Sequence, residues 1–590
     1  MTSNAMLAAT EGTQEALKPI PRCADWLIYF GMVVCSLANA LFGTYESNAD
    51  TAAYLDLSDA IRNHLWHTVV NAYWFPLYPA LLTLGRACFG FRIQYEFLAA
   101  RLIDSVLGLF FVLASVVLAA SMRRLMIARG VTKGALLPPR ILYMWVAVFA
   151  YIFVSVDMVR ITSDALVSSL MVLSVAALLW AVAEDSLSAY IAVGICGGLA
   201  YLAKTFAFPF FILWMMLAVA ANLRKMRVLR RLALSVLVFG LIASPYIWLI
   251  SAAKGRFTYG DTGQLAMAWY INGADQLNPV ADSTLYHHGT AKGELKHPGE
   301  LLSKSPEIIY YSEDHSFGSA PLWNNIAYWS DGISPHFVLR ENIAAIKKCL
   351  TIFVTMQWMR FQVYLLIAAL WWWGFAVRKP LSIDPMLKIA FLVALASIGA
   401  YALVLLEGRY IDFAIVIIGT LFAACAVTSQ LGGEHRSLHS AVLLMTALVL
   451  ISTIQTSNRE WRSFKKEGAR PLQGIYSLAV ISAGADLASR YAPGTEVACM
   501  GDLACRDDPY WARYAGVKIT GIIETGAAVR EMSKKSAEEG CQKLEDNPSG
   551  LELLRKKNIR AIVAKFDGTR PCSAQWKQLG ESPNFYYRPL

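Results

Sequence analysis

The chain has 590 residues, of which 56% are hydrophobic and only 16% are charged, and its formal net charge is +10. This composition excludes an ordinary soluble protein, because such proteins carry about 25% charged residues. The apolar residues are grouped in runs of about 17–25, the length that crosses a bilayer as a helix. In a membrane protein the basic residues mark cytoplasmic loops, so the positive charge does not indicate nucleic acid as a partner.

The chain begins with a polar segment, residues 1–25, which we assign to the cytoplasm. The first apolar run has no small-residue cleavage site, so it is expected to stay as an anchor. A transmembrane domain is predicted over residues 26–456, with eleven spans. The spans cover residues 26–44, 97–121, 141–156, 165–183, 189–203, 205–221, 232–251, 361–377, 389–406, 410–428 and 439–455.

Two choices fix this topology. The apolar stretch 189–221 would be about 50 Å long as a single helix at 1.5 Å per residue, so it is divided at Lys204. Residues 73–90 are interpreted as an interfacial helix and not as a span. Both choices place the basic residues of 123–140 and 224–231 inside, as the positive-inside rule prefers.

The outer side then receives the loops 45–96 and 252–345 and the C-terminal tail. Basic residues between 459 and 470 follow the last span directly and argue for a cytoplasmic tail. Because long segments translocate despite their charge, the tail is still predicted outside. The aromatic side chains of the 252–345 loop suit either sugar faces or the membrane interface, and its pair His287-His288 is interpreted as solvated.

Residues 480–590 are predicted to form a small soluble α/β domain. Short buried strands are expected at 496–502 and 559–566, with a turn at Pro493-Gly494. The tail contains four cysteines, and an even number permits disulfides in an oxidising compartment without fixing their pairing. These cysteines are Cys499, Cys505, Cys541 and Cys572.

Acidic residues open two helices at the outer boundary. Asp50 precedes an amphipathic helix that is expected to lie on the membrane, with Asp56 and Asp59 on its solvated face. Asp164 opens a span after Thr162 and Ser163. Each carboxylate could serve only the positive helix end, but ionisable groups at membrane depth are functional candidates by default.

These outer motifs resemble known families. Asp50-x-x-x-Tyr54, Pro-Leu-Tyr-Pro at 76–79, Ala-Arg-Leu at 100–102 and Thr-Ser-Asp at 162–164 are similar to motifs of lipid A aminoarabinose transferases and protein O-mannosyltransferases. Tyr-Leu-Ala-Lys at 201–204 and Glu-Gly-Arg-Tyr at 407–410 resemble outer-face motifs of related bacterial GT-C proteins. The resemblance covers about 45–410. It implies a polytopic α-helical, GT-C-like membrane protein with interfacial helices in the first outer loop.

The resemblance also implies roles for single residues. It makes Asp50 the catalytic base and Asp164 a second active-site carboxylate. The cations expected to contact the donor phosphate are Lys204, Arg256 and Arg409, of which Arg256 is proposed from its charge alone. The residues expected to bind substrate are Tyr54, Glu407 and Tyr410. The aminoarabinose enzymes have Lys-Pro where this chain has Phe75-Pro76, which weakens any claim to their particular donor.

The predicted function is the inverting transfer of a sugar from a polyprenyl-phosphate donor to an envelope glycan, lipid or protein. It would take place at the outer face of a bacterial inner membrane, among membrane lipid. No metal ligands and no cofactor are assigned, and a divalent metal is left open. The alternative is a transporter or flippase of a lipid-linked saccharide. Such proteins place ionisable groups at the bilayer midplane, whereas here the acidic residues gather at one face.

Overall fold

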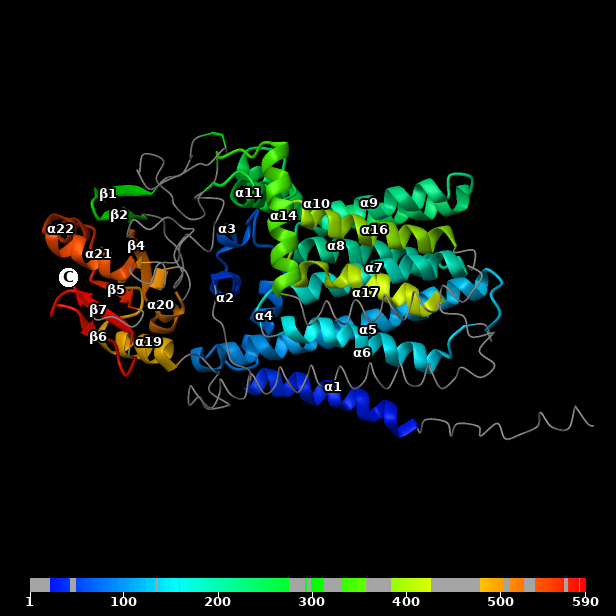
Figure 1. The fold of residues 1–590 in the computed structure, drawn as a ribbon, viewed down its shortest axis with the longest axis horizontal. Coiled ribbons are helices and arrows are strands. Elements are labelled where there is room, and N and C mark those ends of the chain that lie inside the picture. The colour runs from blue at the N-terminus through cyan, green and yellow to red at the C-terminus, as the bar shows by residue number, and fades with distance from the viewer. Residues whose placement is uncertain are drawn as a thin grey trace, which may run out of the picture.

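The computed structural model describes most of the chain in ordered segments. They comprise residues 22–42, 49–133, 136–158, 160–274, 292–293, 299–311, 332–356, 384–425, 478–501, 504–505, 509–524, 536–566, 571–582 and 584–590. A bundle of long helices forms one end of the molecule and a β-sheet with its helices forms the other (Figure 1). Short helices lie between these two parts.

The bundle contains nine of the eleven predicted spans, each of them helical. These helices are α1 (Arg22–Phe42), α5 (Glu96–Ala128), α6 (Pro139–Asp157), α7 (Asp164–Glu184), α8 (Leu187–Ala203), α9 (Ala207–Ala221), α10 (Met226–Lys254), α16 (Pro385–Ala402) and α17 (Gly408–Cys425). In the described segments, five helices are long and apolar enough to cross a membrane. The chain is therefore a multi-pass membrane protein. The predicted spans 361–377 and 439–455 lie outside the described residues, so the total of eleven remains a prediction.

Both topological choices agree with the helix bounds. The stretch 189–221 is divided into α8 and α9, and Lys204 is the residue that follows α8. Residues 73–90 contain only α4 (Leu77–Ala87), whose 11 residues would extend about 16 Å, too short to cross the bilayer. Lys204 therefore marks a break between two helices, and α4 is too short to be a span, as the sequence predicted.

Small residues let the spans pack closely. A Cβ atom on Gly194 or Gly198 of α8 would stand 2.7 Å from side-chain carbons of Val238 or Ile242 of α10. Close backbone approach of this kind is how membrane helices gain packing contacts when lipid is as apolar as their side chains. It holds α8 in place, and with it Lys204 at its end.

The turns that carry the basic residues meet at the end of the bundle away from the sheet (Figure 1). Arg124 pairs with Glu184 at 2.5 Å, and Arg227 pairs with Asp185 at 2.7 Å. The turns after α5, α7 and α9 therefore share one side, as the sequence analysis required.

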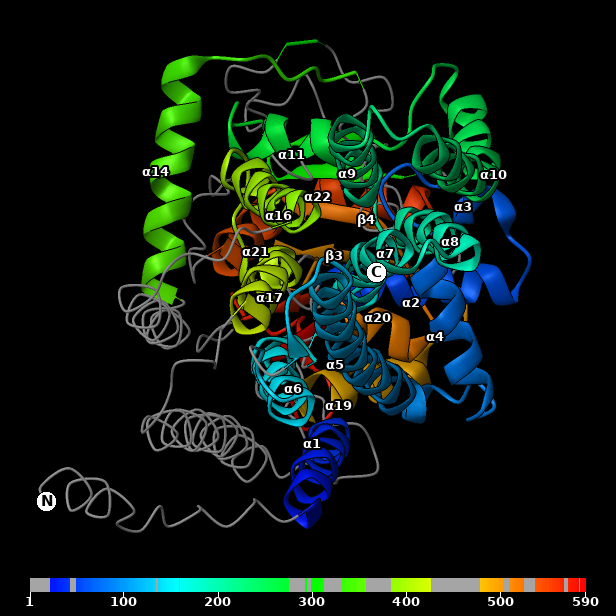
Figure 2. The same ribbon diagram turned by 90° about the vertical axis from the view of Figure 1, so that its right-hand side faces the viewer.

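Short elements cover the opposite end of the bundle. They are α2 (Ala49–Arg62), α3 (Trp66–Val69), α4, η1 (Ile93–Tyr95) and α11 (Thr262–Tyr270). The helix α14 (Leu339–Met356) runs across the direction of the spans at the edge of the bundle, as Figure 2 shows. Among the described residues, this end carries the outer-loop motifs that resemble known families, whereas the pair His287-His288 lies outside the described residues.

The sheet has seven strands in the order β1-β2-β4-β3-β5-β7-β6. The strands are β1 (Glu300–Lys304), β2 (Glu307–Tyr310), β3 (Glu496–Met500), β4 (Lys518–Glu524), β5 (Ala561–Lys565), β6 (Lys577–Gln578) and β7 (Phe585–Pro589), and the helices of this part are α19 (Leu478–Arg490), α20 (Tyr510–Ala515), α21 (Ser536–Asp546) and α22 (Pro548–Lys556). β3 pairs in parallel with β4 and β5. The two strands predicted at 496–502 and 559–566 are confirmed as β3 and β5.

The sheet also contains a hairpin from the outer loop 252–345, where no strand was predicted. β1 and β2 pair with each other, and β2 pairs antiparallel with β4 of the tail. Ile308 of β2 is fully buried among tail residues such as Ala498 and Ile562. The 252–345 loop and the tail therefore lie on the same side of the bundle. Two disulfides brace the tail, Cys499–Cys505 and Cys541–Cys572.

One prediction about α2 is wrong. Asp56 and Asp59 were expected on a solvated face, but Asp56 is fully buried and only 13% of the Asp59 side chain is exposed. Both carboxylates pair with Arg513 of α20. The periodicity correctly found two faces on this helix, but the polar face meets the tail domain and not water.

Candidate active site

Four helix ends bring the predicted charged residues together. Asp50 is in the first turn of α2, and Asp164 opens α7. Lys204 follows the last residue of α8, and Arg409 is the second residue of α17. Ionisable side chains are costly in the interior of the membrane, and these four lie where helices begin or end.

Arg409 lies between the two proposed catalytic carboxylates. Its Nη1 atom is 3.5 Å from Oδ2 of Asp164, and its Nη2 atom is 3.7 Å from Oδ2 of Asp50. The ammonium group of Lys204 donates a hydrogen bond to Oδ1 of Asp164. Asp164 therefore holds both cations on one side of the site, with Asp50 facing them from α2.

The Glu407–Tyr410 motif completes this group of charges. Arg409 Nε donates to Glu407 Oε2 at 2.7 Å, and Arg409 Nη2 donates to the Tyr410 hydroxyl at 3.0 Å. Lys204 Nζ lies 4.1 Å from the centre of the Tyr410 ring, a cation–π distance. Arg160 adds a longer contact to Glu407, at 3.8 Å.

Tyr54 connects α2 to α7. It follows Asp50 by four residues and so lies on the same face of the helix. Its hydroxyl is 3.0 Å from the hydroxyl of Ser163, the residue before Asp164. Its ring packs edge-on against Trp74 and Tyr78, with centroids 4.9 and 4.8 Å away. Tyr54 thus fixes the face of α2 that carries Asp50.

The environment makes Asp50 a stronger base than an ordinary aspartate. Burial raises the pKa of its carboxyl group, because desolvation disfavours the charged form. The positive charge of Arg409 lowers this pKa, and the negative charge of Asp164 raises it again. The burial is partial, because 34% of the side chain remains exposed.

Two other residues named in the sequence analysis have different partners. Arg256 donates a 2.8 Å hydrogen bond to Asp261, which also accepts one from Thr258. Phe75 stands where the aminoarabinose enzymes have lysine, and it is buried against the rings of Tyr201 and Tyr246. This position supplies packing here and no positive charge.

Two contributors to this group were not among the predicted site residues. Arg160 and Ser163 both belong to the short turn before Asp164, and they contact Glu407 and Tyr54. Their position beside a singled-out aspartate was the available signal. In the part of the chain that the structure describes, no group of three or more His, Cys, Asp and Glu side chains could hold a metal ion.

No protein-family model matches the sequence, and no curated protein matches it at a significant level. Solved structures do match. The apo structure of ArnT from Cupriavidus metallidurans has a TM-score of 0.53 at 14% identity, with 96% of this chain and 98% of that chain covered. The chain has the ArnT fold. ArnT bound to undecaprenyl phosphate matches with the same TM-score at 13% identity and the same coverage.

A weaker match is the Saccharomyces cerevisiae Pmt1-Pmt2 protein O-mannosyltransferase complex bound to its sugar donor. The TM-score is 0.38 at 12% identity, with 80% of this chain and 92% of that chain covered. ArnT is a lipid A aminoarabinose transferase of the GT-C class. The GT-C resemblance that was predicted from the outer motifs is therefore confirmed at the level of the fold.

Proposed function

We propose that this protein is a glycosyltransferase that moves a sugar from a polyprenyl-phosphate donor to an acceptor of the cell envelope. The observation that carries the proposal is the grouping of Asp50 and Asp164 with Lys204 and Arg409 at one end of the bundle. It gives one site both an accessible carboxylate and fixed cations. The shared fold with a protein that has been seen with undecaprenyl phosphate supports the same reading.

Each half of the reaction has a matching group. Asp50 takes the proton of the acceptor hydroxyl, whose oxygen then forms a bond to the anomeric carbon of the sugar. The bond from that carbon to the phosphate oxygen breaks on the opposite face, so the configuration inverts. The polyprenyl phosphate leaves with the electron pair, and Lys204 and Arg409 stabilise its negative charge.

The neighbouring residues have supporting roles in this proposal. Asp164 orients the two cations, while Tyr54, Glu407 and Tyr410 border the space for substrate. Arg256 is a weaker candidate for phosphate contact, because Asp261 already accepts a hydrogen bond from it. The acceptor is a glycan, lipid or protein of the envelope.

The proposed location is the bacterial inner membrane, with the site and the sheet domain on the periplasmic side. The basic turns lie at the other end of the bundle, and cytoplasmic loops are the ones enriched in Lys and Arg. The two disulfides of the tail also favour an oxidising compartment.

The test is transfer by the purified protein from a panel of polyprenyl-phosphate sugars, with Asp50→Asn beside the wild type. Loss of the general base should lower turnover by about 10²–10⁴-fold. If Asp50 only complements the positive end of α2, the change should cost the helix about 0.3–1 kcal/mol and leave turnover nearly intact.

Glu539→Gln, which neutralises an exposed carboxylate on α21, is the control and should keep normal turnover. Full turnover in a folded Asp50→Asn protein would contradict the role of Asp50. Movement of an intact lipid-linked saccharide across vesicles without sugar transfer would instead favour the transporter alternative.

A further inference from the structure

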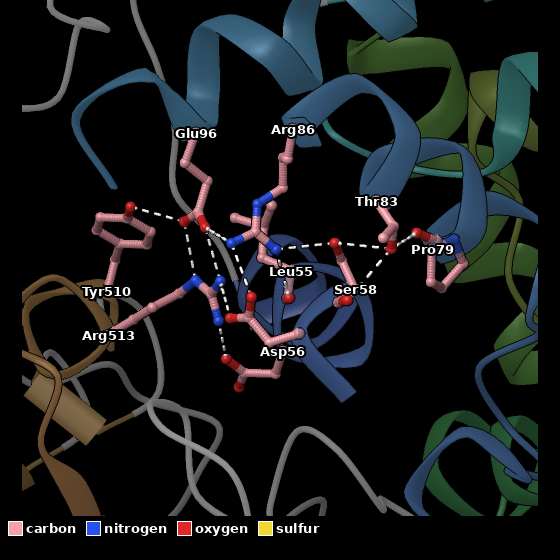
Figure 3. Close-up of polar contacts among 10 residues, drawn as sticks. Leu55, Asp56, Ser58, Pro79, Thr83, Arg86, Glu96, Tyr510 and Arg513 are labelled. Carbon is pink, nitrogen blue, oxygen red and sulfur yellow. Dashed lines mark hydrogen bonds and ion pairs between the residues drawn. The ribbon is translucent and has the colours of Figure 1, made fainter. Parts of the chain in front are cut away.

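A buried arginine of the tail domain reaches three carboxylates of the membrane domain. Arg513 of α20 is 4% exposed. It donates to Glu96 at 2.8 Å from Nε and 2.6 Å from Nη2, and it also pairs with Asp56 and Asp59 of α2 (Figure 3). Tyr510, from the same helix, donates to Glu96 at 2.8 Å.

A second arginine shares these carboxylates from α4. Arg86 Nη2 lies 2.8 Å from Asp59 and 2.7 Å from Glu96, and Arg86 Nη1 donates to Ser58 of α2 at 2.8 Å. Three carboxylates thus face two guanidinium groups in a buried space. Removing Arg513 would leave two negative charges in excess there, which a site of low dielectric tolerates poorly.

The network holds the back of the helix whose front carries the proposed base. Asp50 and Asp59 are nine residues apart, which is two and a half helical turns, so they project from opposite faces of α2. Tyr54 lies on the front with Asp50. A shift or rotation of α2 that moved Asp50 would therefore also pull Asp56 and Asp59 away from Arg513.

We infer that Arg513 is a positioning residue, through which the tail domain sets the place of Asp50 relative to Lys204 and Arg409. This inference rests on the proposed function. Lys204 follows α8 and Arg409 belongs to α17, so neither proposed phosphate contact is carried by the helix that Arg513 holds. Turnover is expected to depend on the contact with Arg513, because a misplacement of Asp50 by about 1 Å can lower the rate by about 10²-fold.

The experiment compares Arg513→Met with Arg588→Met in the full-length protein. Arg588 is also buried, and it pairs within the tail with the partly exposed Glu545 at 2.6 Å, a pair that does not involve α2. We expect Arg513→Met to lower kcat by about 10–100-fold with donor affinity unchanged. Hydrogen exchange in α2 should become faster as well. Arg588→Met should change neither kcat nor exchange in α2.

Two further variants should show smaller changes in kcat and in hydrogen exchange of α2. Arg513→Lys keeps the charge without the planar fork, so it should recover part of the lost kcat. Asp56→Asn weakens the contact while leaving two carboxylates for two guanidinium groups, so it should fold even if Arg513→Met does not. It should show a smaller loss of kcat and faster exchange in α2.

Normal kcat in both Arg513→Met and Asp56→Asn would overturn the inference. So would an equal loss in Arg588→Met, which would show a general effect of tail stability. Exchange in α2 is measured without any substrate. A wild-type protein that transfers no sugar, with α2 still loosened in Arg513→Met, would therefore count against the proposed function and not against the contact.

Discussion

Arg409 makes contacts of two different lengths. Its bond to Glu407 is 2.7 Å long, but its distances to Asp50 and Asp164 are 3.7 and 3.5 Å. A tight charge-assisted hydrogen bond measures about 2.7–2.9 Å. A turn of the Nη atoms toward the proposed phosphate would therefore break no short bond to either aspartate. Nη2 would give up its 3.0 Å hydrogen bond to the Tyr410 hydroxyl, while Nε would stay anchored on Glu407.

This geometry predicts that donor affinity depends more on Arg409 than on Arg256. Arg409→Ala should weaken binding of a polyprenyl-phosphate donor, because a charge-assisted contact to phosphate is lost. Arg409→Lys should restore binding only in part, since lysine lacks the fork. Arg256→Ala is the matched comparison, and titration of each purified variant with donor measures the difference. Equal losses for Arg256→Ala and Arg409→Ala would contradict this ranking.

The raised pKa of Asp50 predicts a particular pH dependence. A general base acts only when it is deprotonated. Because burial raises the pKa of Asp50, the active form is lost at a higher pH than for an ordinary aspartate as the solution is acidified. The acidic limb of kcat/KM against pH should therefore lie above about 3.9, the usual aspartate pKa. The residual activity of Asp50→Asn should lack this limb, and a limb that persists would assign it to another group.

At the scale of helices and strands, local sequence patterns predicted the features that depend on neighbouring residues, such as where a helix begins and ends. Hydrophobic run lengths and the break at Lys204 gave helix bounds close to those of α8 and α9. The break between these two helices is where Lys204 lies. Strand partners are not local, however, and the four residues of β2 carry no mark of the strand that pairs with them. This is why the pairing of β2 with β4 was missed.

The same limit applies to α2. Helical periodicity separates a polar face from an apolar one, but it does not show whether water or an ion-pair partner covers the polar face. Asp56 finds Arg513 more than 450 residues later in the chain. Nothing near either residue in the sequence reveals that contact.

The hairpin predicts a stability effect far from the tail in sequence. Ile308→Ala in the full-length protein should destabilise the sheet domain by about 2–5 kcal/mol, because it leaves a cavity in a packed core. The melting temperature measures the change, with the exposure of tail residues used to monitor thermal unfolding. Lys304→Ala, at an exposed position of the same hairpin, should have little effect. An unchanged melting temperature for Ile308→Ala would show that the hairpin does not belong to the tail's core.

For the whole molecule, the two ends of the bundle should lie on opposite sides of the membrane. Glu552→Cys on α22 and Lys225→Cys before α10 place exposed thiols at these ends. The exposed Cys88 is replaced by serine in both variants. A membrane-impermeant thiol reagent applied to intact cells should label Glu552→Cys only, while Lys225→Cys should need broken cells. Labelling of both positions from the same side would refute the proposed topology.

The divided sheet also sets an order of events during synthesis. β2 leaves the ribosome about 200 residues before its partner β4. At about 5–20 residues per second, the hairpin waits roughly 10–40 s with one edge unpaired and its isoleucines uncovered. An open strand edge of this kind is a template for wrong pairing. The interval before the tail arrives is therefore the stage at which a chaperone on that side of the membrane would have the most to protect.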